Sequence, residues 1–311
     1  MKIVFFGTAG FAVPALKALN ESQHDVVAVV TGVDRRGGRG RKEILISPVK
    51  KYAVEQQLKL LQPPNLKSEA FQSELQSLQA DAFAVVAFRM LPEGVWGMPE
   101  RGTVNLHASL LPAYRGAAPI NHAIIQGEKK TGLSVFLLKK EIDTGDILCS
   151  EKVTIGPDET AGELHDRMAL IGAELLENCI SRWERGELDP VPQDHRQASS
   201  APKIFKEFCL LDFSLDTDSV YNKIRGLSPY PGAYTPFGDK ELKIFRATTE
   251  KAGDHVSAKT GIIKSDGKNY LKIKTADGWI DCKEVQLQGK RKMDVEEFLN
   301  GMGDKLPAFA G

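Results

Sequence analysis

The sequence has little cysteine, and its cysteines lack the spacing of a metal or redox site. The four of them, Cys149, Cys179, Cys209 and Cys282, lie at least 30 residues apart. There is no Cys-x-x-Cys pair, and no histidine spacing is typical of a zinc site. The pattern therefore excludes a zinc ribbon or a thioredoxin-like motif. It predicts reduced, mostly buried thiols and no bound metal.

Long apolar runs and an excess of one charge are also missing. No apolar run approaches the ~20 residues that span a bilayer, and no secretory leader precedes the first predicted strand. We therefore expect no membrane partner and a cytoplasmic location. The 41 lysines and arginines balance the 41 aspartates and glutamates, so a nucleic-acid partner would have to be held by local basic patches. Nothing in the sequence indicates assembly, and we expect a monomer.

The chain is long enough for two domains, and the first has the pattern of an α/β fold. Residues 2–6 and 26–31 are short apolar runs, and residues 82–88 form a fully apolar run typical of a strand buried on both faces. Segments with apolar residues at helical spacing, such as 11–21, alternate with these runs. The alternation predicts a first domain over residues 1–188 that is Rossmann-like, with a mostly parallel sheet and helices on both faces.

The second domain has a different period. Residues 189–206 are rich in polar residues and proline without apolar periodicity, which predicts a linker. Residues 207–311 then alternate with period two, which is typical of short strands joined by turns. The five expected strands lie near Tyr234 and over residues 240–246, 261–264, 270–275 and 279–287. They predict a small β-barrel of the oligonucleotide-binding (OB-like) type as the C-terminal domain.

Two polar side chains lie near the end of a predicted strand over residues 103–107. Asn105 and His107 are separated by one residue, which places both on the same face of a strand. His107 lies at the carboxyl end of a parallel strand, where α/β proteins bind ligands, and Pro112 and Gly116 fix the path of the following loop. A lone histidine is usually structural, and we interpret the other five histidines in that way.

A candidate carboxylate lies in the segment Asp143-Thr144-Gly145-Asp146, between strands expected over residues 132–138 and 147–155. Aspartate and glycine are common in turns, and alone the segment would indicate no more than a turn. Between two strands, however, it could bring a carboxylate to the same edge of the sheet as His107. An amide, an imidazole and a carboxylate at one place suit acyl-type transfer to an amine.

The first strand ends in the turn Gly7-Thr8-Ala9-Gly10-Phe11-Ala12. A dinucleotide-binding turn has the spacing Gly-x-Gly-x-x-Gly and an acid after the second strand, a position that Asp34 could fill. Here Ala9 and Ala12 replace two of the glycines, and the Cβ atom of Ala9 would lie where a pyrophosphate needs close approach to the backbone. Nicotinamide binding is therefore disfavoured, although such turns still border ligand crevices.

A basic run follows the second strand. Residues 35–42 contain five cations, three glycines and no acid. Charge runs are usually solvated loops, but the position of this one at the proposed edge of the sheet favours a loop that contacts phosphates. A second cluster, at residues 290–292, could contact another part of the same RNA.

The blocks Asn105 to Ile120 and Glu141 to Asp146 closely resemble the folate-dependent formyltransferases. The similarity extends over nearly the whole chain and includes residues 5–8, 34–42, 47–50 and 84–92, and more weakly 228–233. Within this family, the residues Arg115 to Ile120, the basic run and the added small domain are similar to the members that formylate initiator methionyl-tRNA. The resemblance implies transfer of a formyl group from 10-formyltetrahydrofolate, as co-substrate, to the α-amine of methionine on that tRNA.

The resemblance also implies a role for particular residues. The catalytic residues would be Asn105, His107 and Asp143, with Asp143 preferred to Asp146 on the family pattern. The second domain would bind tRNA. The folate pocket would be formed by two segments: Ser109, Leu110, Leu111 and Pro112, and Phe88, Arg89, Met90 and Leu91. Arg89 departs from the family, in which a Tyr-Gly pair is common in that segment. The tRNA substrate would be contacted by Phe11, Arg35, Arg36, Arg39, Arg41 and Lys42.

Three alternatives stay open at this point. A formyltransferase for a small amine, such as glycinamide ribonucleotide or an amino sugar nucleotide, would need the same three residues but no basic run. A dinucleotide oxidoreductase would have to use the altered glycine turn. A catalytically silent RNA-binding module would bind RNA without transferring a formyl group.

Overall fold

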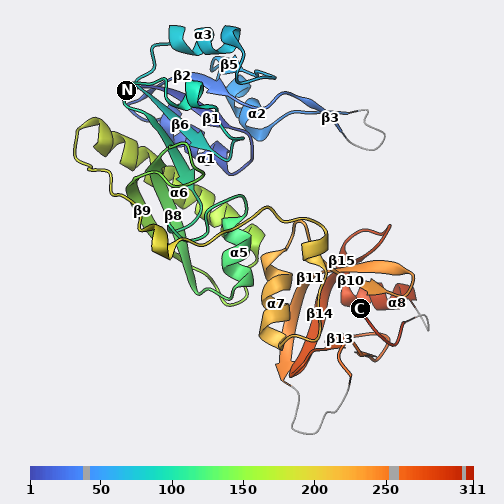
Figure 1. Ribbon diagram of the computed structural model, residues 1–311. Coiled ribbons are helices and arrows are strands. Elements are labelled where there is room, and N and C mark those ends of the chain that lie inside the picture. Colours follow the sequence, from blue (N-terminus) through green and yellow to red (C-terminus); the bar gives the residue numbers. More distant parts are fainter. Residues whose placement is uncertain (38–42, 252–258, 303–305) are drawn as a thin grey trace. The chain divides into compact units, whose positions relative to one another are not determined.

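The computed structural model describes residues 1–311 except for 38–42, 252–258 and 303–305. The chain divides into two compact units (Figure 1). Unit 1 contains residues 1–116, 132–153 and 165–200, and unit 2 contains residues 117–131, 154–164 and 201–311. Unit 2 therefore includes two segments that precede residue 201 and are separated from its main part by segments of unit 1. The domain boundaries expected at residues 188 and 206 stay a prediction.

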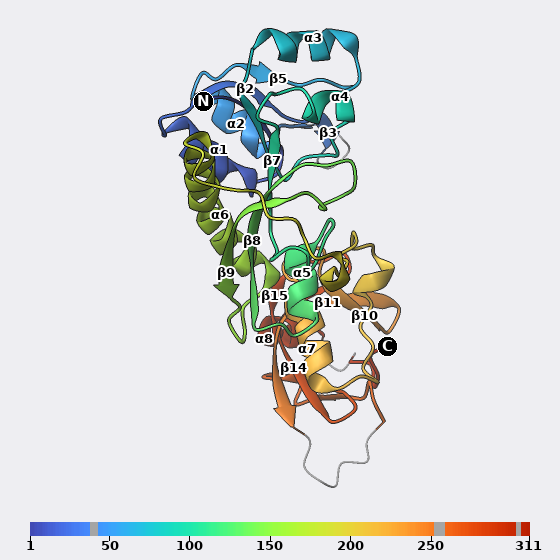
Figure 2. The same cartoon turned by 60° about the vertical axis from the view of Figure 1, so that its left-hand side comes forward.

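Unit 1 is built on a seven-stranded sheet with the order β5-β2-β1-β6-β7-β8-β9 (Figures 1 and 2). The first five strands in this order pair in parallel, and β8 pairs with β7 in the antiparallel direction. This confirms the predicted mostly parallel sheet. The strands are β1 (Lys2–Gly7), β2 (Asp25–Val30), β5 (Leu60–Leu61), β6 (Ala82–Val86), β7 (Thr103–His107), β8 (Lys130–Leu137) and β9 (Ile147–Thr154).

Helices cover both faces of this sheet. On one face, Val4 and Phe6 of β1 share a buried cluster with Phe71 of α3 and Val95 of α4. On the other face, α6 approaches β7 so closely that a Cβ atom at Gly172 would lie 2.9 Å from the Leu106 side chain. The first six α-helices along the chain are α1 (Ala12–Asn20), α2 (Pro48–Glu55), α3 (Glu69–Ser77), α4 (Glu93–Trp96), α5 (Pro119–Ile125) and α6 (Ala161–Glu184).

Local sequence signals explain where two of these helices begin. Ser47 caps α2, and its hydroxyl accepts a hydrogen bond from the Lys50 amide at 3.0 Å, with Pro48 as the first helical residue. The capping box at α6 pairs the Thr160 amide with the Glu163 carboxylate at 2.9 Å. At the first turn, a Cβ atom on Gly7 would lie 2.8 Å from that of Ala12, so only glycine permits this close passage from β1 to α1.

The strand order reverses at β1, and this point defines the expected ligand site at the carboxyl ends of the parallel strands. The chain continues from β1 to β2 on one side and later enters β6 on the other side of β1, so the order reverses there. Ligands of open α/β sheets bind outside the carboxyl ends at such a point. Gly7, Val86 and His107 end the three neighbouring strands β1, β6 and β7.

The larger part of unit 2 is an antiparallel β domain, as predicted. Its strand order is β10-β11-β14-β13-β12, and β15 pairs with β14. The bounds are β10 (Ala233–Phe237), β11 (Lys240–Lys251), β12 (Ile263–Ser265), β13 (Leu271–Lys274), β14 (Gly278–Leu287) and β15 (Met293–Asp294), with helices α7 (Thr217–Gly226) and α8 (Val295–Met302). The five strands expected from the sequence correspond to β10 to β14.

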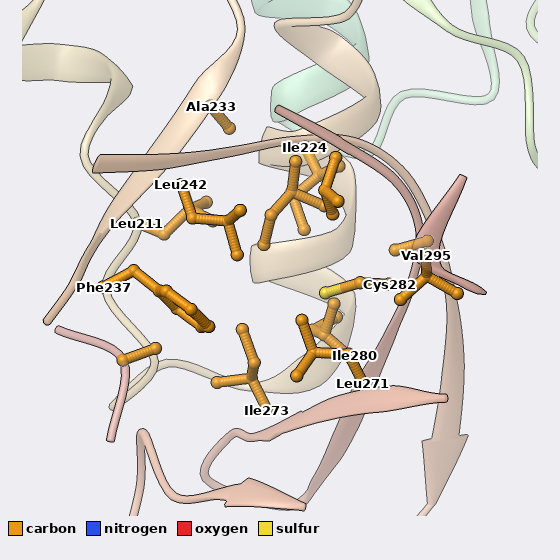
Figure 3. Close-up of a cluster of buried hydrophobic side chains, with 14 of the residues drawn as sticks. Leu211, Ile224, Ala233, Phe237, Leu242, Leu271, Ile273, Ile280, Cys282 and Val295 are labelled. Atoms are coloured by element: carbon orange, nitrogen blue, oxygen red, sulfur yellow. The ribbon is translucent and has the colours of Figure 1, made fainter. Parts of the chain in front are cut away.

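The core of this domain lies between the sheet and its helices (Figure 3). Phe237, Leu242 and Ile273 of the sheet pack in one buried cluster with Ile224 of α7 and Val295 of α8. The chain's last residues connect the two ends of the strand order. Phe309 bridges to Ile262, just before β12, and Ala310 bridges to Phe237 of β10.

Further findings bear on the absences noted in the sequence. Cys179, Cys209 and Cys282 are buried and Cys149 is half-buried, and none of the four is in a disulfide, so the prediction of mostly buried thiols is confirmed. Among the described residues, no helix is long and apolar enough to cross a membrane. The same residues contain no cluster of three or more histidine, cysteine, aspartate or glutamate side chains that could hold a metal ion.

Candidate active site

Strand β7 places Asn105 and His107 on one face of the sheet. Asn105 pairs with Val85, which belongs to the cluster under α3 and α4, whereas Leu106 faces α6. The neighbouring strand β8 places Phe136 opposite Asn105 and Ser134 opposite His107. The two candidate catalytic side chains therefore share a face, as the strand period predicts.

The imidazole of His107 is held by three groups. Its Nε2 atom lies 2.9 Å from the Tyr114 carbonyl oxygen, its Nδ1 atom lies 3.8 Å from Asp143 Oδ2, and the Phe136 ring meets it edge-on with centroids 6.5 Å apart. The Tyr114 carbonyl can only accept a hydrogen bond, so Nε2 carries a proton. His107 is 7% exposed. Its ring is thus fixed in orientation, with one nitrogen directed at a carboxylate.

Asp143 reaches His107 across the face of the sheet. Because β8 runs antiparallel to β7, it ends beside Val104, at the opposite end of β7 from His107. The following loop folds back over Phe136, and a Cβ atom on Gly145 would lie 3.3 Å from that ring and only 1.6 Å from the Leu137 carbonyl oxygen. The sequence suggested delivery to the carboxyl edge of the sheet. The carboxylate does lie beside His107, which ends β7, and the antiparallel direction of β8 explains why the loop first crosses the face of the sheet to reach it.

The carboxylate itself is anchored from the loop after β7. Asp143 Oδ2 accepts a hydrogen bond from the Gly116 amide at 2.8 Å. Asp143 has a φ angle of 54°, a left-handed conformation that is uncommon for residues other than glycine. The structure therefore brings His107 and Asp143 together from distant parts of the sequence and places Asn105 on the same strand face as His107.

Asn105 differs from its two neighbours in having no fixed partner. Its side chain is half-buried, and it makes no hydrogen bond to any residue in the part of the chain that the structure describes. An amide in this state can donate to a bound molecule without first losing an internal contact.

The turn that was expected to contact folate, residues 109–112, is braced by its own hydrogen bonds. Ser109 Oγ donates to the Ala113 carbonyl at 2.6 Å, and Ser134 Oγ accepts from the Leu111 amide at 3.0 Å and donates to the Ser109 carbonyl at 2.8 Å. The Leu111–Pro112 peptide is cis. Ser109 and Leu111 are buried, and Leu110 packs over Gly132. A ligand at this turn would meet mainly its backbone.

The side chains of the second expected folate segment, residues 88–91, point in different directions. Phe88 packs edge-on against Phe6 with centroids 5.6 Å apart, and Leu91 is buried in the same cluster. Arg89 turns away and donates to the carbonyls of Pro63 and Pro64 at 2.6 and 3.3 Å, and Met90 is 71% exposed. The segment follows β6, next to β7, so it lies at the carboxyl edge of the sheet.

The residues expected to contact tRNA do not form one group. Phe11 is 6% exposed and packs on the His165 ring, with centroids 5.2 Å apart. Arg35 and Arg36 are exposed on a short hairpin of β3 (Arg35–Gly37) and β4 (Glu43–Leu45). Arg39, Arg41 and Lys42 lie outside the described residues. Asp34, the possible acid of a dinucleotide site, is instead paired with Lys50 at 2.5 Å, and this contact lowers the pKa of its carboxyl group.

Sequence reasoning missed a set of residues in the predicted linker. Gln193 is 6% exposed, and its amide contacts the Asp143 turn and Arg115. Ser199 accepts a hydrogen bond from the Tyr114 amide at 2.9 Å through its hydroxyl, and its carbonyl accepts one from the Arg115 amide at 2.8 Å. No signal in the sequence could have found them, because a glutamine in a polar stretch without periodicity has the pattern of an exposed linker. All these residues, like Asn105, His107 and Asp143, belong to unit 1.

Comparison with known proteins identifies the class. The family model described as Formyl transferase matches residues 1–180, and the one described as Formyl transferase, C-terminal domain matches residues 203–303. The chain belongs to the formyltransferase family.

Curated relatives of high similarity have a more specific name. The chain is 43% identical over 310 residues to a protein of Bacteroides thetaiotaomicron named methionyl-tRNA formyltransferase, with 97% of this chain and 95% of that protein covered. It is 46% identical, with the same coverage, to a protein of the same name from Porphyromonas gingivalis.

Solved structures share the fold at lower sequence identity. Methionyl-tRNA formyltransferase from Clostridium thermocellum is 18% identical with a TM-score of 0.56, covering 89% of this chain and 100% of that one. The sugar 3N-formyltransferase WlaRD is 18% identical with a TM-score of 0.68, covering 94% and 99%. At this identity the likeness concerns the fold alone.

Proposed function

We propose that this protein transfers the formyl group of 10-formyltetrahydrofolate to the α-amine of methionine esterified to initiator tRNA. The observation that carries the proposal is the identity of 43–46% over 97% of the chain to curated proteins named methionyl-tRNA formyltransferase. Because the match includes both the sheet domain and the C-terminal domain, it covers more than the shared chemistry of formyl transfer.

Catalysis requires stabilisation of the charge that develops on the formyl oxygen when the amine attacks. The Asn105 amide, which is half-buried and has no partner among the described residues, supplies one donor. His107 supplies the second through Nδ1–H, because Nε2 already donates to the Tyr114 carbonyl, whereas Nδ1 lies 3.8 Å from Asp143, beyond hydrogen-bond distance. Loss of one such donor typically raises the barrier by ~2.7–4 kcal/mol, because a buried donor that is already oriented needs no reorganisation during the reaction.

Asp143 orients the imidazole and removes a proton. Its carboxylate faces His107 Nδ1 at 3.8 Å. At this separation the carboxylate can attract the protonated ring directly or contact it through one bridging water. As the amine attacks, its nitrogen becomes acidic, and the carboxylate accepts that proton through water. When the tetrahedral intermediate collapses, the bond between the formyl carbon and folate N10 breaks. The proton held by Asp143 is returned through water to N10, so that tetrahydrofolate leaves as a neutral amine. General acid-base contributions of this kind are about 10²–10⁴-fold. Every step is carried out by side chains of unit 1, without a covalent intermediate.

Folate would bind at the carboxyl edge of the sheet, beside these groups. The backbone of residues 109–112 and the segment of residues 88–91 border this place from β7 and β6. Related folds support the assignment, since HypX from Aquifex aeolicus was solved in complex with tetrahydrofolic acid and WlaRD in the presence of 5-N-formyl-THF. The Arg89 side chain is held by the carbonyls of Pro63 and Pro64, and Met90 is the exposed side chain next to the proposed folate site.

The tRNA would be contacted through local basic residues, because the chain as a whole is neutral. Arg35 and Arg36 present exposed cations on the β3–β4 hairpin, next to the exposed apolar side chains of Ile44 and Leu45. The run continues with Arg39, Arg41 and Lys42, and the C-terminal domain adds Lys290, Arg291 and Lys292 as a second cluster. We propose a monomeric, cytoplasmic enzyme, in line with substrates that are themselves cytoplasmic.

The test is transfer of labelled formyl from 10-formyltetrahydrofolate to charged tRNA. We expect rapid formylation of methionyl initiator tRNA and slow formylation of methionyl elongator tRNA. Glycinamide ribonucleotide and an amino sugar nucleotide are added as competing acceptors. Preferential formylation of either small amine would replace the proposal with the small-amine alternative. Binding of tRNA without any transfer would replace it with a silent RNA-binding function.

A further inference from the structure

Gln193 lies in the segment that the sequence predicts as a linker, yet it is a buried part of unit 1. The side chain is 6% exposed, and both the nitrogen and the oxygen of its amide make hydrogen bonds. Nε2 donates to the carbonyl oxygens of Asp143 at 3.0 Å and Gly145 at 2.7 Å. Oε1 accepts from Arg115 Nε at 3.2 Å and Nη2 at 2.6 Å. Such a set of contacts is typical of a side chain that fixes the backbone around it.

The turn that Gln193 contacts is one that needs support. Asp143 has a φ angle of 54°, a conformation that costs an L-residue on the order of 1–3 kcal/mol unless its surroundings hold it. The turn is also tightly packed, because a Cβ atom on Gly145 would clash with the Leu137 carbonyl oxygen. Without the Gln193 amide, the carbonyl oxygens of Asp143 and Gly145 would lose this hydrogen-bond donor. A buried carbonyl without a donor costs more free energy than one at the surface, where water can donate instead.

The other end of Gln193 connects this turn to the loop after β7. Arg115 donates to Gln193 Oε1, and the next residue, Gly116, donates its amide to the Asp143 carboxylate at 2.8 Å. Gln193 thus holds the backbone of Asp143, and the Arg115–Gly116 segment holds its side chain. The two sides of the Asp143 turn are fixed to each other through one glutamine.

We infer that Gln193 is a positioning residue, which acts by holding the Asp143 carboxylate at its distance from His107. The inference rests on the proposed function, in which Asp143 takes part in formyl transfer. Among the described residues, the side-chain hydrogen bonds of Gln193 go to Asp143, Gly145 and Arg115, and none goes to His107 or to the proposed binding segments. Its loss should therefore reduce kcat and leave the KM values for folate and tRNA nearly unchanged. A purely structural role would lower stability without this selectivity.

The experiment uses two substitutions with different chemistry. Gln193→Ala removes both ends of the amide. Gln193→Glu has almost the same shape and keeps an acceptor for Arg115, but it places carboxylate oxygen against the two carbonyls. We expect both to lower kcat on the order of 10- to 100-fold, since a displacement near 1 Å at a catalytic group can cost about 10²-fold. Gln197→Ala is the matched control, because Gln197 is exposed on the same segment and its amide donates to Asp194.

A double-mutant cycle separates positioning from other effects. If Gln193 acts through Asp143, adding Gln193→Ala to Asp143→Ala should cause no further loss of kcat. Additive losses would overturn the inference, and so would a normal kcat in the Gln193→Glu variant. Circular dichroism and the urea midpoint show whether each variant is folded. If Gln193→Ala unfolds, the isosteric Gln193→Glu still decides the question.

The outcomes for the inference and for the proposed function are distinct. No formyl transfer by the wild-type protein would overturn the proposed function and, with it, the role of Gln193. Normal turnover of Asp143→Ala would remove Asp143 from the site and also contradict the inference. Loss of turnover in Asp143→Ala with full turnover in the Gln193→Glu variant would contradict the inference alone.

Discussion

Asn105 and His107 share one strand face but differ in how firmly the protein holds them. His107 is fixed by the Tyr114 carbonyl, Asp143 and Phe136, whereas the Asn105 amide is bound to nothing among the residues described. An oriented ring next to an available amide gives two donors of different kinds. One is set in place before substrate arrives, and the other can adjust to it.

We predict that Asn105→Ala, His107→Ala and Asp143→Ala each lose most turnover. Loss of an oxyanion donor should lower kcat about 10²–10³-fold, and loss of Asp143 should fall within the general acid-base range of about 10²–10⁴-fold. The measurement is single-turnover formyl transfer at saturating substrates. Binding of tRNA and the urea midpoint serve as controls and should be unchanged. Normal turnover in any one variant removes that residue from the catalytic group.

A second residue-scale prediction concerns the thiol of Cys149 on β9. A hydrogen bond with the Cys179 thiol lowers the pKa of Cys149 to about 7 and raises that of Cys179. Cys149 is half-buried, and the other three cysteines are buried. The thiolate of Cys149 should therefore be about half populated near neutral pH, where an ordinary thiol with a pKa of about 8.5 is almost fully protonated.

Iodoacetamide labelling followed by peptide mass spectrometry measures this difference. Cys149 should react first, and its rate should rise with a midpoint near the pKa of about 7. In the Cys179→Ala variant the midpoint should move up toward the ordinary thiol value. A wild-type midpoint already at the ordinary value would show that the two thiols do not interact in solution.

Local geometry could be predicted for single residues, whereas their tertiary contacts could not. The strand period placed Asn105 and His107 on one face, because alternation depends only on local geometry. Gln193 could not be found, because its role depends on a tertiary contact 50 residues away along the chain. Arg89 was recognised as a departure from the family, but its contacts with Pro63 and Pro64 could not be foreseen.

Elements that bury apolar residues were predicted better than elements that do not. The fully apolar run of residues 82–88 became the buried strand β6, and the capping box at Thr160 begins α6 as expected. The β3–β4 hairpin was missed, because a three-residue strand of Arg-Arg-Gly shows no apolar alternation. The four-residue helix α4 is likewise too short to have a period.

The capping box of α6 provides a prediction about acid stability. The Thr160 backbone amide, and then the Arg246 guanidinium, lower the pKa of Glu163 from 4.5 to about 2. A group with a depressed folded-state pKa stabilises the protein above its unfolded pKa, and this contribution is lost as pH falls through the folded value. Acidification from about 4.5 to about 2 should therefore remove the stabilisation that Glu163 supplies.

Gln at this position retains the cap but has no charge. Glu163→Gln should consequently be less stable than wild type at neutral pH, and the difference in urea midpoint should shrink as pH falls through that window. The magnitude should be small, because the Glu163 side chain is 49% exposed. Arg246→Gln should reduce the pH dependence only in part, since the Thr160 amide remains. A constant difference between wild type and Glu163→Gln at all pH values would contradict the linkage.

At the scale of the whole molecule, the two fold types were predictable from the sequence, and the domain boundaries at residues 188 and 206 stay a prediction. The change from helical period to period two indicated an α/β domain followed by an antiparallel one. The structure assigns residues 117–131 and 154–164, which precede the expected linker, to the same unit as the C-terminal domain. Contacts such as Asn121 Nδ2 to the Gly226 carbonyl at 2.7 Å create this grouping, and they connect residues that are far apart in sequence.

The neutral charge of the whole chain leads to a prediction about tRNA binding. Because attraction must come from local cations, neutralising Arg35 and Arg36 together should weaken tRNA binding and flatten the salt dependence by roughly one slope unit per lost phosphate contact. The measurement is the slope of log K against log salt concentration. Lys17→Ala, on α1 with a side chain that is 58% exposed, is the matched control. An unchanged slope in the double variant would show that the hairpin is only a solvated loop.

The path of the Asp143 loop over Phe136 of β8 limits the insertions and deletions that this protein can accept during evolution. Connecting loops usually tolerate insertions and deletions, because they extend into solvent. Between Leu137 and Gly145, however, one residue more or less would shift the carboxylate by a spacing of about 3.8 Å between Cα atoms. That shift is as large as the separation of Asp143 from His107. Length in this loop should therefore be invariant among active descendants of this sequence, even where its side chains diverge.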